Sequence, residues 1–360
     1  MPRIRAECVA GCSLAALVVA FAAGCESSAG PAPVPRSWRM GFSPIPPRQD
    51  PTVVFQSLEM WTKRADAAIL HIPPPWAALL ADTAPAVLLQ RDAVPLVNYF
   101  RGKGLSVVIT VDVTDGLDRS KEAPELDSLG RSITDTAVQR RYVEYVNALD
   151  SILHPDYLGL AAETNLIRAA APDSVYQAVV QMANAAAARV NARNPSQRLY
   201  VSVQVEVAWG RLPPPGSYVG IAQDLTDFPF VEAVGLSSYP YLAGFSVPES
   251  LPLDYYSRLV VGHSLPELVV EGGWTSASVG PVVSSPAIEA RYLDRQAQLL
   301  DSAHAIAVFQ LTFADLDLSS ITLPPGSILP LFAHIGVVDS ALGPKPALAV
   351  WDRLYQRPLR

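Results

Sequence analysis

The sequence has few cysteines and no concentrated positive charge. Only three of its 360 residues are cysteine, and Cys8, Cys12 and Cys25 all lie within the first 25 positions. A disulfide or a Cys-ligated metal is therefore excluded from the rest of the chain. The 27 Lys and Arg residues are scattered and the formal charge is −7. This removes the basic surface on which nucleic-acid binding depends, so no nucleic-acid partner is predicted.

Two further motif classes are missing. The five histidines form no closely spaced pair of the kind found in zinc motifs, so nothing predicts a metal site. The first apolar run leads into Gly41-Phe42-Ser43-Pro44 and not into a glycine-rich phosphate loop. What the chain does have is 50% apolar residues with 17% charged ones, which is typical of a globular protein of one large or two modest domains.

The N-terminus has the pattern of an export signal. Arg3 and Arg5 precede an apolar stretch, residues 9–23, that ends in small residues. It is shorter than the ~20 residues needed to span a bilayer. The segment Ala22-Ala23-Gly24-Cys25 resembles the lipobox of bacterial lipoproteins, in which cleavage precedes the cysteine and that cysteine is lipidated. An ordinary signal peptide with a chance cysteine is the alternative.

These features predict three regions. Residues 1–24 form a lipoprotein signal peptide, residues 25–36 form a Ser/Pro/Ala-rich tether with the lipidated Cys25, and residues 37–360 form one domain. The expected location is extracytoplasmic, with the protein lipid-anchored to a bacterial membrane on the periplasmic side or the cell surface. A monomer is expected because no exposed apolar stripe is evident.

From residue 37 the chain alternates short apolar runs with amphipathic stretches, which indicates α/β architecture with a parallel sheet. Eight strands are predicted, at residues 38–43, 67–72, 105–111, 157–162, 199–205, 233–238, 268–271 and 305–311. Helices are predicted at residues 52–65, 94–101, 135–153, 174–193, 286–303 and 346–354. Eight such units favour a (β/α)8 TIM barrel, and an open doubly wound sheet is the alternative.

Two glutamates lie where such a barrel places its active site, at the carboxyl ends of strands. Glu163 follows the fourth apolar run and Glu271 ends the seventh. Strands four and seven lie on opposite sides of an eight-stranded barrel, so the two carboxyl groups can face each other across its mouth. Such a pair suits glycosidic cleavage, in which one carboxyl protonates the leaving oxygen and the other attacks or stabilises the sugar cation. A loop salt bridge or a helix cap is the alternative for each glutamate.

Three short segments carry a family resemblance. They are Gly159-Leu160-Ala161-Ala162-Glu163-Thr164-Asn165, Val234-Gly235-Leu236-Ser237-Ser238-Tyr239-Pro240-Tyr241 and Val269-Val270-Glu271-Gly272-Gly273-Trp274. Together they resemble the clan A glycoside hydrolases, which are TIM barrels, and the second and third look most like the endo-β-1,4-galactanase family and its uncharacterised relatives. The segment from Phe332 to Ala347 also resembles the closing turn of these barrels.

The resemblance implies roles for particular residues. Glu163 would be the general acid/base and Glu271 the nucleophile, and Tyr239 would hydrogen-bond the nucleophile; no cofactor is implied. One position departs from the family, because Ala162 stands where the family has an Asn that bonds the sugar 2-hydroxyl. That bond strengthens in the transition state, so its loss removes part of the catalytic stabilisation.

Other side chains near the predicted strand ends are candidates for substrate binding. Aromatic rings pack on the apolar faces of sugars, and polar side chains hydrogen-bond sugar hydroxyls. The aromatic candidates are Trp76, Trp209, Tyr241 and Trp274, and the polar ones are His71, Asp112, Asn165 and Gln310. Core packing beneath long loops, or a structural role for the histidine, is the alternative.

The sequence therefore predicts a membrane-tethered retaining glycoside hydrolase that acts on a β-linked poly- or oligosaccharide. Two other hypotheses remain open. One is a catalytically weakened barrel that binds glycans at the cell surface, which Ala162 favours. The other is a purely structural envelope lipoprotein, which would have a flat or plugged barrel mouth.

Overall fold

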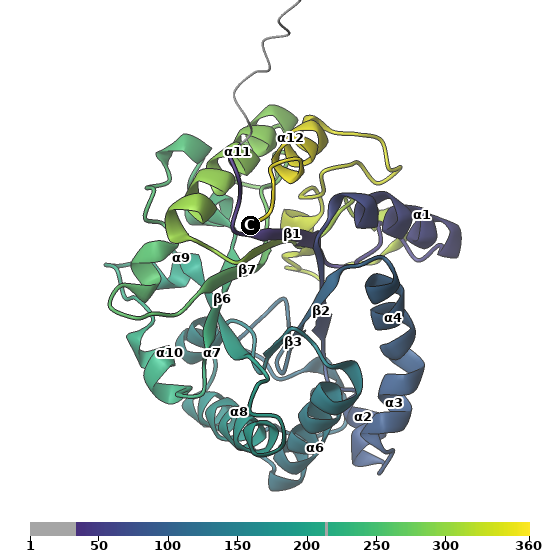
Figure 1. Cartoon of the computed structure of the whole chain (residues 1–360). Coiled ribbons are helices and arrows are strands. Elements are labelled where there is room, and N and C mark those ends of the chain that lie inside the picture. The colour runs from purple at the N-terminus through teal and green to yellow at the C-terminus, as the bar shows by residue number, and fades with distance from the viewer. Residues whose placement is uncertain (1–33, 213–214) are drawn as a thin grey trace, which may run out of the picture. The chain divides into compact units, whose positions relative to one another are not determined.

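The computed structural model describes residues 34–212 and 215–360. Eight parallel strands pair in chain order, and β8 pairs with β1, so the sheet closes into a barrel. Figure 1 shows the strands around the centre and the helices outside them. The predicted (β/α)8 fold is confirmed.

The strands occupy the eight predicted apolar runs with small shifts at their ends. Their bounds are β1 (Arg39–Phe42), β2 (Ala67–Ile72), β3 (Ser106–Val111), β4 (Tyr157–Gly159), β5 (Leu199–Gln204), β6 (Ala233–Ser238), β7 (Glu267–Gly272) and β8 (Ala307–Gln310). The largest difference is β4, which ends at Gly159. The next two residues still hydrogen-bond to β5 through Leu160 N–H and the Ala161 carbonyl, so the chain stays beside the sheet up to Glu163.

Twelve α-helices lie in the described part of the chain. They are α1 (Pro51–Trp61), α2 (Trp76–Leu80), α3 (Pro85–Asp92), α4 (Val94–Gly102), α5 (Pro124–Ser128), α6 (Thr136–Leu153), α7 (Thr164–Ala170), α8 (Asp173–Arg193), α9 (Val205–Ala208), α10 (Ala222–Asp227), α11 (Pro286–Ala303) and α12 (Pro346–Tyr355). Six of them match the predicted helices. Short 3-10 helices add η1 (Thr62–Arg64), η2 (Pro240–Ala243), η3 (Pro248–Ser250), η4 (Ser257–Val260), η5 (Leu318–Ser320) and η6 (Leu329–Phe332).

The inside of the barrel is filled by its own side chains. A buried cluster within it contains Ile69, Val108, Tyr200, Leu268 and Phe309. A larger buried cluster contains the side chains between the strands and the helices. Because side chains fill the lower barrel, a ligand has room only above them, at the carboxyl ends of the strands.

The packed domain begins by Arg36, the last residue of the predicted tether. Its side chain is buried and pairs with Asp66 at 2.6 Å, and its backbone N–H donates to the Pro358 carbonyl. Both ends of the domain therefore lie together. The predicted signal peptide and Cys25 lie outside the described residues.

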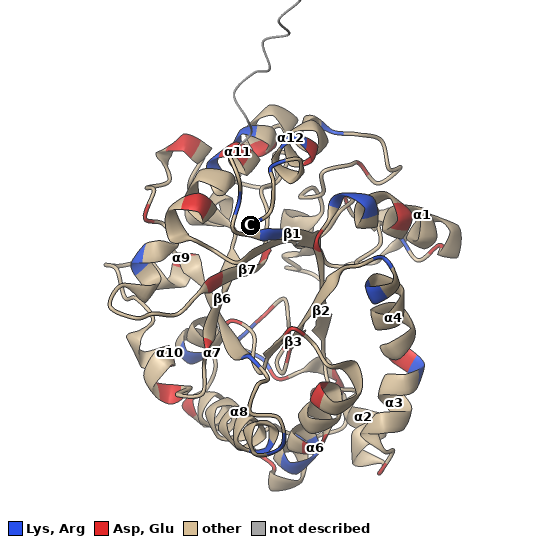
Figure 2. Cartoon of the chain, in the orientation of Figure 1, with Lys and Arg blue, Asp and Glu red and all other residues tan. Residues whose placement is uncertain are grey.

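The outer surface mixes both signs of charge. Figure 2 shows acidic and basic residues interspersed over the helices around the barrel. Within residues 34–212 and 215–360, none of the helices is both long and apolar enough to cross a bilayer.

Candidate active site

A register shift in the sheet positions Glu271. Along the β6–β7 pair, Leu236 lies opposite Val269, but the next residue, Ser237, lies opposite Glu271. Val270 is the extra residue of this irregularity. Bulges of this kind turn a side chain to a new direction and are frequent beside active sites. Here the shift brings the Glu271 carboxyl next to the Ser237 hydroxyl.

Glu163 is held in an unusual backbone conformation. Its φ of 49° lies in the left-handed region, which is uncommon for a residue with a side chain. The residue directly precedes α7, and its backbone N–H donates to Ser202 Oγ at 2.9 Å. A non-glycine residue held in this region stores strain, which concentrates at functional sites. In this conformation the Glu163 carboxyl group contacts Ser237 and Arg119.

Ser237 joins the two carboxyl groups. Its Oγ lies 2.6 Å from Glu163 Oε1 and 2.7 Å from Glu271 Oε1, so these carboxyl oxygens are at most about 5.3 Å apart. Since a hydroxyl has one proton to donate, both contacts are hydrogen bonds only if one carboxyl is protonated and donates to Ser237. The geometry thus describes a pair of carboxyl groups that share one proton.

Arg119 pairs with Glu163 from the other side. The guanidinium donates to Glu163 Oε2 at 2.8 Å through Nε, and its Nη1 donates to Asp112 and to Thr114. The Arg119 side chain is only 4% exposed, so this ion pair is shielded from water. A guanidinium bound in this way stabilises the carboxylate form of Glu163.

The shared proton is therefore expected on Glu271. Burial, and then the nearby charge of Glu163, raises the pKa of Glu271 to about 8. His71 Nε2 lies 3.5 Å from the second oxygen, Glu271 Oε2. Burial lowers the pKa of His71 to about 4, so its ring is neutral at pH 7.

Tyr239 follows β6 directly and lines, together with Glu163 and Glu271, a cavity at the mouth of the barrel. Its ring packs edge-on against Phe332, with centroids 4.9 Å apart. Burial, and then the charge of Glu271, raises the pKa of Tyr239 well above its ordinary value, so the phenol stays protonated. Within the described residues its hydroxyl makes no hydrogen bond to Glu271, although it lies near enough to sense that charge.

These side chains surround a cavity of about 400 Å³, named here the carboxylate cavity. It lies at the mouth of the barrel and is open. Its polar lining consists of His71, Asp112, Arg119, Glu163, Gln204, Tyr239, Glu271 and Thr312. The hypothesis of a purely structural lipoprotein requires a flat or plugged barrel mouth. This mouth is neither flat nor plugged.

The four aromatic candidates lie away from this cavity. Trp76 and Trp274 are each 1% exposed and belong to the core. Trp209 stacks on Tyr255 and donates to its carbonyl, and the Tyr241 hydroxyl donates to the Leu331 carbonyl. None of the four rings lines the carboxylate cavity.

Two of the four polar candidates are also occupied elsewhere. Asn165 forms two hydrogen bonds with the Gln204 backbone, at 2.7 and 2.9 Å, and thereby ties α7 to β5. Gln310 is 1% exposed and donates to Gln296. His71 and Asp112, in contrast, line the carboxylate cavity together with the two glutamates.

Several residues of the site were not predicted. Arg119 lies in the loop after β3, and no sequence pattern assigns it a partner 44 positions away. Ser237 lies within the segment from Val234 to Tyr241 that carries the family resemblance. Its contact with Glu271 could not be predicted, because it depends on the register shift between β6 and β7. Glu206 follows β5 and is a strand-end acid that the same rule could have found. It is buried, accepts hydrogen bonds from Gln204, Ser238 and Tyr255, and fixes the Tyr239 backbone N–H at 3.1 Å.

Within the described residues no three His, Cys, Asp or Glu side chains gather in a metal-binding arrangement. Comparison with known proteins gives no match to a family model and none to a curated protein sequence.

Solved structures do match. An exo-β-1,4-mannosidase from an Opitutaceae bacterium is 15% identical, with a TM-score of 0.66 over 89% of this chain and 60% of that one. A GH5_18 protein from Streptomyces cattleya, in complex with GlcNAc, is 16% identical, with a TM-score of 0.62 over 91% of this chain and 83% of that one. A GH10 endoxylanase from a sugarcane soil metagenome is 12% identical, with a TM-score of 0.59 over 88% of this chain and 97% of that one.

The chain spans between half and three-fifths of the first three structures that it matches. At these identities the likeness concerns the fold. The resemblance to the clan A glycoside hydrolases, predicted from three short segments, is thus confirmed at that level: this chain has the barrel fold that they share.

Proposed function

We propose that this protein is a retaining glycoside hydrolase that cleaves a β-linked saccharide with Glu163 and Glu271. The observation that supports this most is the single Ser237 hydroxyl in contact with both carboxyl groups. Retaining enzymes hold their two carboxyl groups ~5–5.5 Å apart, whereas inverting enzymes need at least ~6.5 Å to admit a water. The upper limit of about 5.3 Å between the nearest oxygens supports the first class.

In this proposal Glu163 is the acid/base and Glu271 is the nucleophile. Glu163 protonates the glycosidic oxygen while Glu271 attacks the anomeric carbon, which gives a glycosyl-enzyme intermediate and releases the aglycone. Glu163 then takes a proton from water as that water displaces Glu271. Tyr239 lies beside both groups and its phenol can donate to Glu271 once that carboxyl is ionised.

Before the reaction, a proton must be transferred from Glu271 to Glu163. Arg119 favours the Glu163 carboxylate, and the raised pKa of Glu271 places the proton there. For catalysis the proton passes from Glu271 to Ser237 Oγ while Ser237 gives its own proton to Glu163. The number of protons in the pair is unchanged by this exchange. Saccharide binding that draws Arg119 away from Glu163 would favour it.

A second candidate function is the binding of glycans without hydrolysis. Ala162 stands where the family has an asparagine, and Arg119 occupies one oxygen of the proposed acid. Both favour a barrel that binds glycans without cleaving them.

One experiment separates these two functions. The full chain is incubated with aryl β-glycosides and β-linked polysaccharides, alongside Glu163→Gln, Glu271→Gln and Glu267→Gln. Glu267 is a matched control because it is a buried glutamate of the same strand, β7, and does not line the carboxylate cavity. Sugar release that is lost only in the first two variants, with a β-configured first product by NMR, supports the hydrolase. Binding without release in the parent supports the glycan-binding protein.

The proposed location follows from the N-terminal residues. We propose that Cys25 is lipidated and that the chain holds the barrel at a membrane surface outside the cytoplasm. Metabolic labelling with a palmitate analogue, lost in Cys25→Ser, tests this; equal labelling of both would contradict it.

A further inference from the structure

The carboxylate cavity is polar at its base and aliphatic above. The polar side chains come mostly from strand ends, whereas the loops contribute Leu117, Leu242, Leu316, Ile328 and Leu329. Leu117 and Ile328 are exposed, at 43% and 40%. Sugar hydroxyls need hydrogen-bond partners when they are buried, and these walls offer none. The base fits a sugar, and the walls fit an apolar group attached to it.

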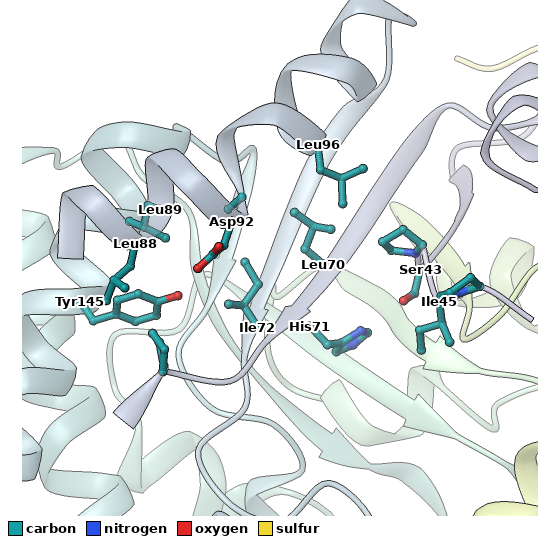
Figure 3. A pocket seen from close by; sticks show the side chains of 14 residues that line it. Ser43, Ile45, Leu70, His71, Ile72, Leu88, Leu89, Asp92, Leu96 and Tyr145 are labelled. Carbon is teal, nitrogen blue, oxygen red and sulfur yellow. The ribbon is translucent and has the colours of Figure 1, made fainter. Parts of the chain in front are cut away.

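A second cavity of about 350 Å³ adjoins the first and is named here the aliphatic cavity. Leu70 and Ile72 of β2 form one side, and Leu88, Leu89 and Leu96 of α3 and α4 form the other. Asp92 also lines it, and its carboxylate pairs with Arg91. Figure 3 shows Ser43, Ile45 and His71 at one end of this cavity and Leu88, Leu89 and Tyr145 at the other. Ile45 and His71 line both cavities, so they form the boundary between them.

This boundary lies beside the reacting groups. His71 Nε2 is 3.5 Å from Glu271 Oε2, so the aliphatic cavity begins one side chain away from the proposed nucleophile. Ile45 is half-buried and apolar, and the His71 ring is neutral because burial lowers its pKa to about 4. An alkyl chain could cross this boundary without approaching a charge on the imidazole.

We propose that the aliphatic cavity binds the alkyl or acyl chain of an amphiphilic β-glycoside whose sugar lies at Glu163 and Glu271. This inference rests on the proposed function, because that function places the sugar. It commits to an apolar aglycone and makes glycolipid-like substrates better than unsubstituted oligosaccharides. A lipid anchor at Cys25 would hold the domain where such molecules occur.

The test compares pairs of glycosides that differ only in the chain. Methyl and n-octyl β-glucoside, β-galactoside and β-mannoside are titrated into the full chain by calorimetry, below the micelle-forming concentration. Each buried methylene group strengthens binding roughly fourfold, so for the sugar that fits we expect the octyl glycoside to bind more than about tenfold tighter than the methyl one. Equal affinity of methyl and octyl glycosides for every sugar would overturn the inference.

A variant that fills the cavity gives the matched control. Leu96 is half-buried and lines only the aliphatic cavity. Leu96→Trp should abolish the octyl advantage and leave methyl glycoside binding unchanged. Leu253 is 53% exposed and lines neither cavity, so Leu253→Trp should keep the tighter binding of the octyl glycoside. If Leu96→Trp does not fold by circular dichroism, Leu96→Asn makes the same test by placing an amide in the apolar cavity.

Two further arms separate this inference from the proposed function. Octyl glycoside binding that Leu96→Trp removes, in a protein that hydrolyses nothing, keeps the inference and rejects the hydrolase. Hydrolysis of methyl and octyl glycosides with equal kcat/KM keeps the hydrolase and rejects the inference. Free n-octanol is the third ligand, and if it binds as tightly as the octyl glycosides, the cavity serves free chains and the inference is rejected.

Discussion

Replacing Glu163 by Gln should lower the pKa of Glu271. In the parent, its surroundings raise the pKa of Glu271 from an ordinary 4.5 to about 8. At 1.36 kcal/mol per pKa unit, this difference amounts to roughly 5 kcal/mol against ionisation. Burial is the larger cause and the Glu163 charge is the next. The amide removes the charge and leaves the burial, so the pKa should fall below 8 and stay above 4.5.

The measurement is carbon-13 NMR of protein labelled at the glutamate side-chain carboxyl carbon. The Glu271 signal is the one that disappears in Glu271→Gln. Glu267 provides an internal control, because burial alone raises the pKa of this second β7 glutamate to about 8. Its titration should be the same in the parent and in Glu163→Gln.

Two results would refute this reasoning. One is a Glu271 signal that titrates near 4.5 in the parent, which would mean that the two carboxyl groups do not share a proton. The other is a titration near 8 that Glu163→Gln leaves unchanged, which would remove the electrostatic link between them. The catalytic activity should depend on the protonation of the same pair of carboxyl groups. Since the pair must carry one proton to act, kcat/KM should fall as the pH rises through about 8.

Three other predictions follow from single contacts. Within the described residues, both carboxyl oxygens of Glu267 are buried without a hydrogen-bond partner, so the folded state binds a proton more tightly than the unfolded chain and loses stability as the pH rises from 4.5 to about 8. Glu267→Gln should therefore raise the free energy of unfolding at pH 8 by up to roughly 5 kcal/mol, and by much less at pH 4.5. Thermal unfolding at the two pH values measures this, and an equal rise in Tm at both would contradict it. Ser237→Ala should lower kcat on a hydrolysed glycoside by about tenfold or more with little change in KM, because the hydroxyl that joins the carboxyl groups is lost; an unchanged kcat would exclude the proton transfer. Asn165→Ala should lower the free energy of unfolding in urea by about 2 kcal/mol, since it leaves two backbone groups of Gln204 unpaired, and a change below 0.5 kcal/mol, within the range of ordinary surface substitutions, would show that water replaces the side chain.

The eight strands and six long helices could be predicted because their signals are local. Leu105 to Val111 is an almost unbroken β-branched run, and parallel strands covered on both faces require such runs. Helix starts were similarly readable, as at Pro286, where the preceding Ser285 caps α11. Short helices such as α7 and α9 were missed because four to seven residues carry too little periodicity.

The chain order of the strands also determined that Glu163 and Glu271 could face one mouth, since a closed barrel brings all strand ends together. What surrounds them was decided by tertiary structure alone. Arg119 reaches Glu163 only because the loop after β3 folds over the barrel, and Ser237 meets Glu271 only because the β6–β7 register shifts by one residue. The four aromatic candidates do not line the carboxylate cavity, because residue type does not tell where a loop places a ring. Sequence thus determined which groups the barrel mouth could contain, and packing between distant segments decided which of them come into contact.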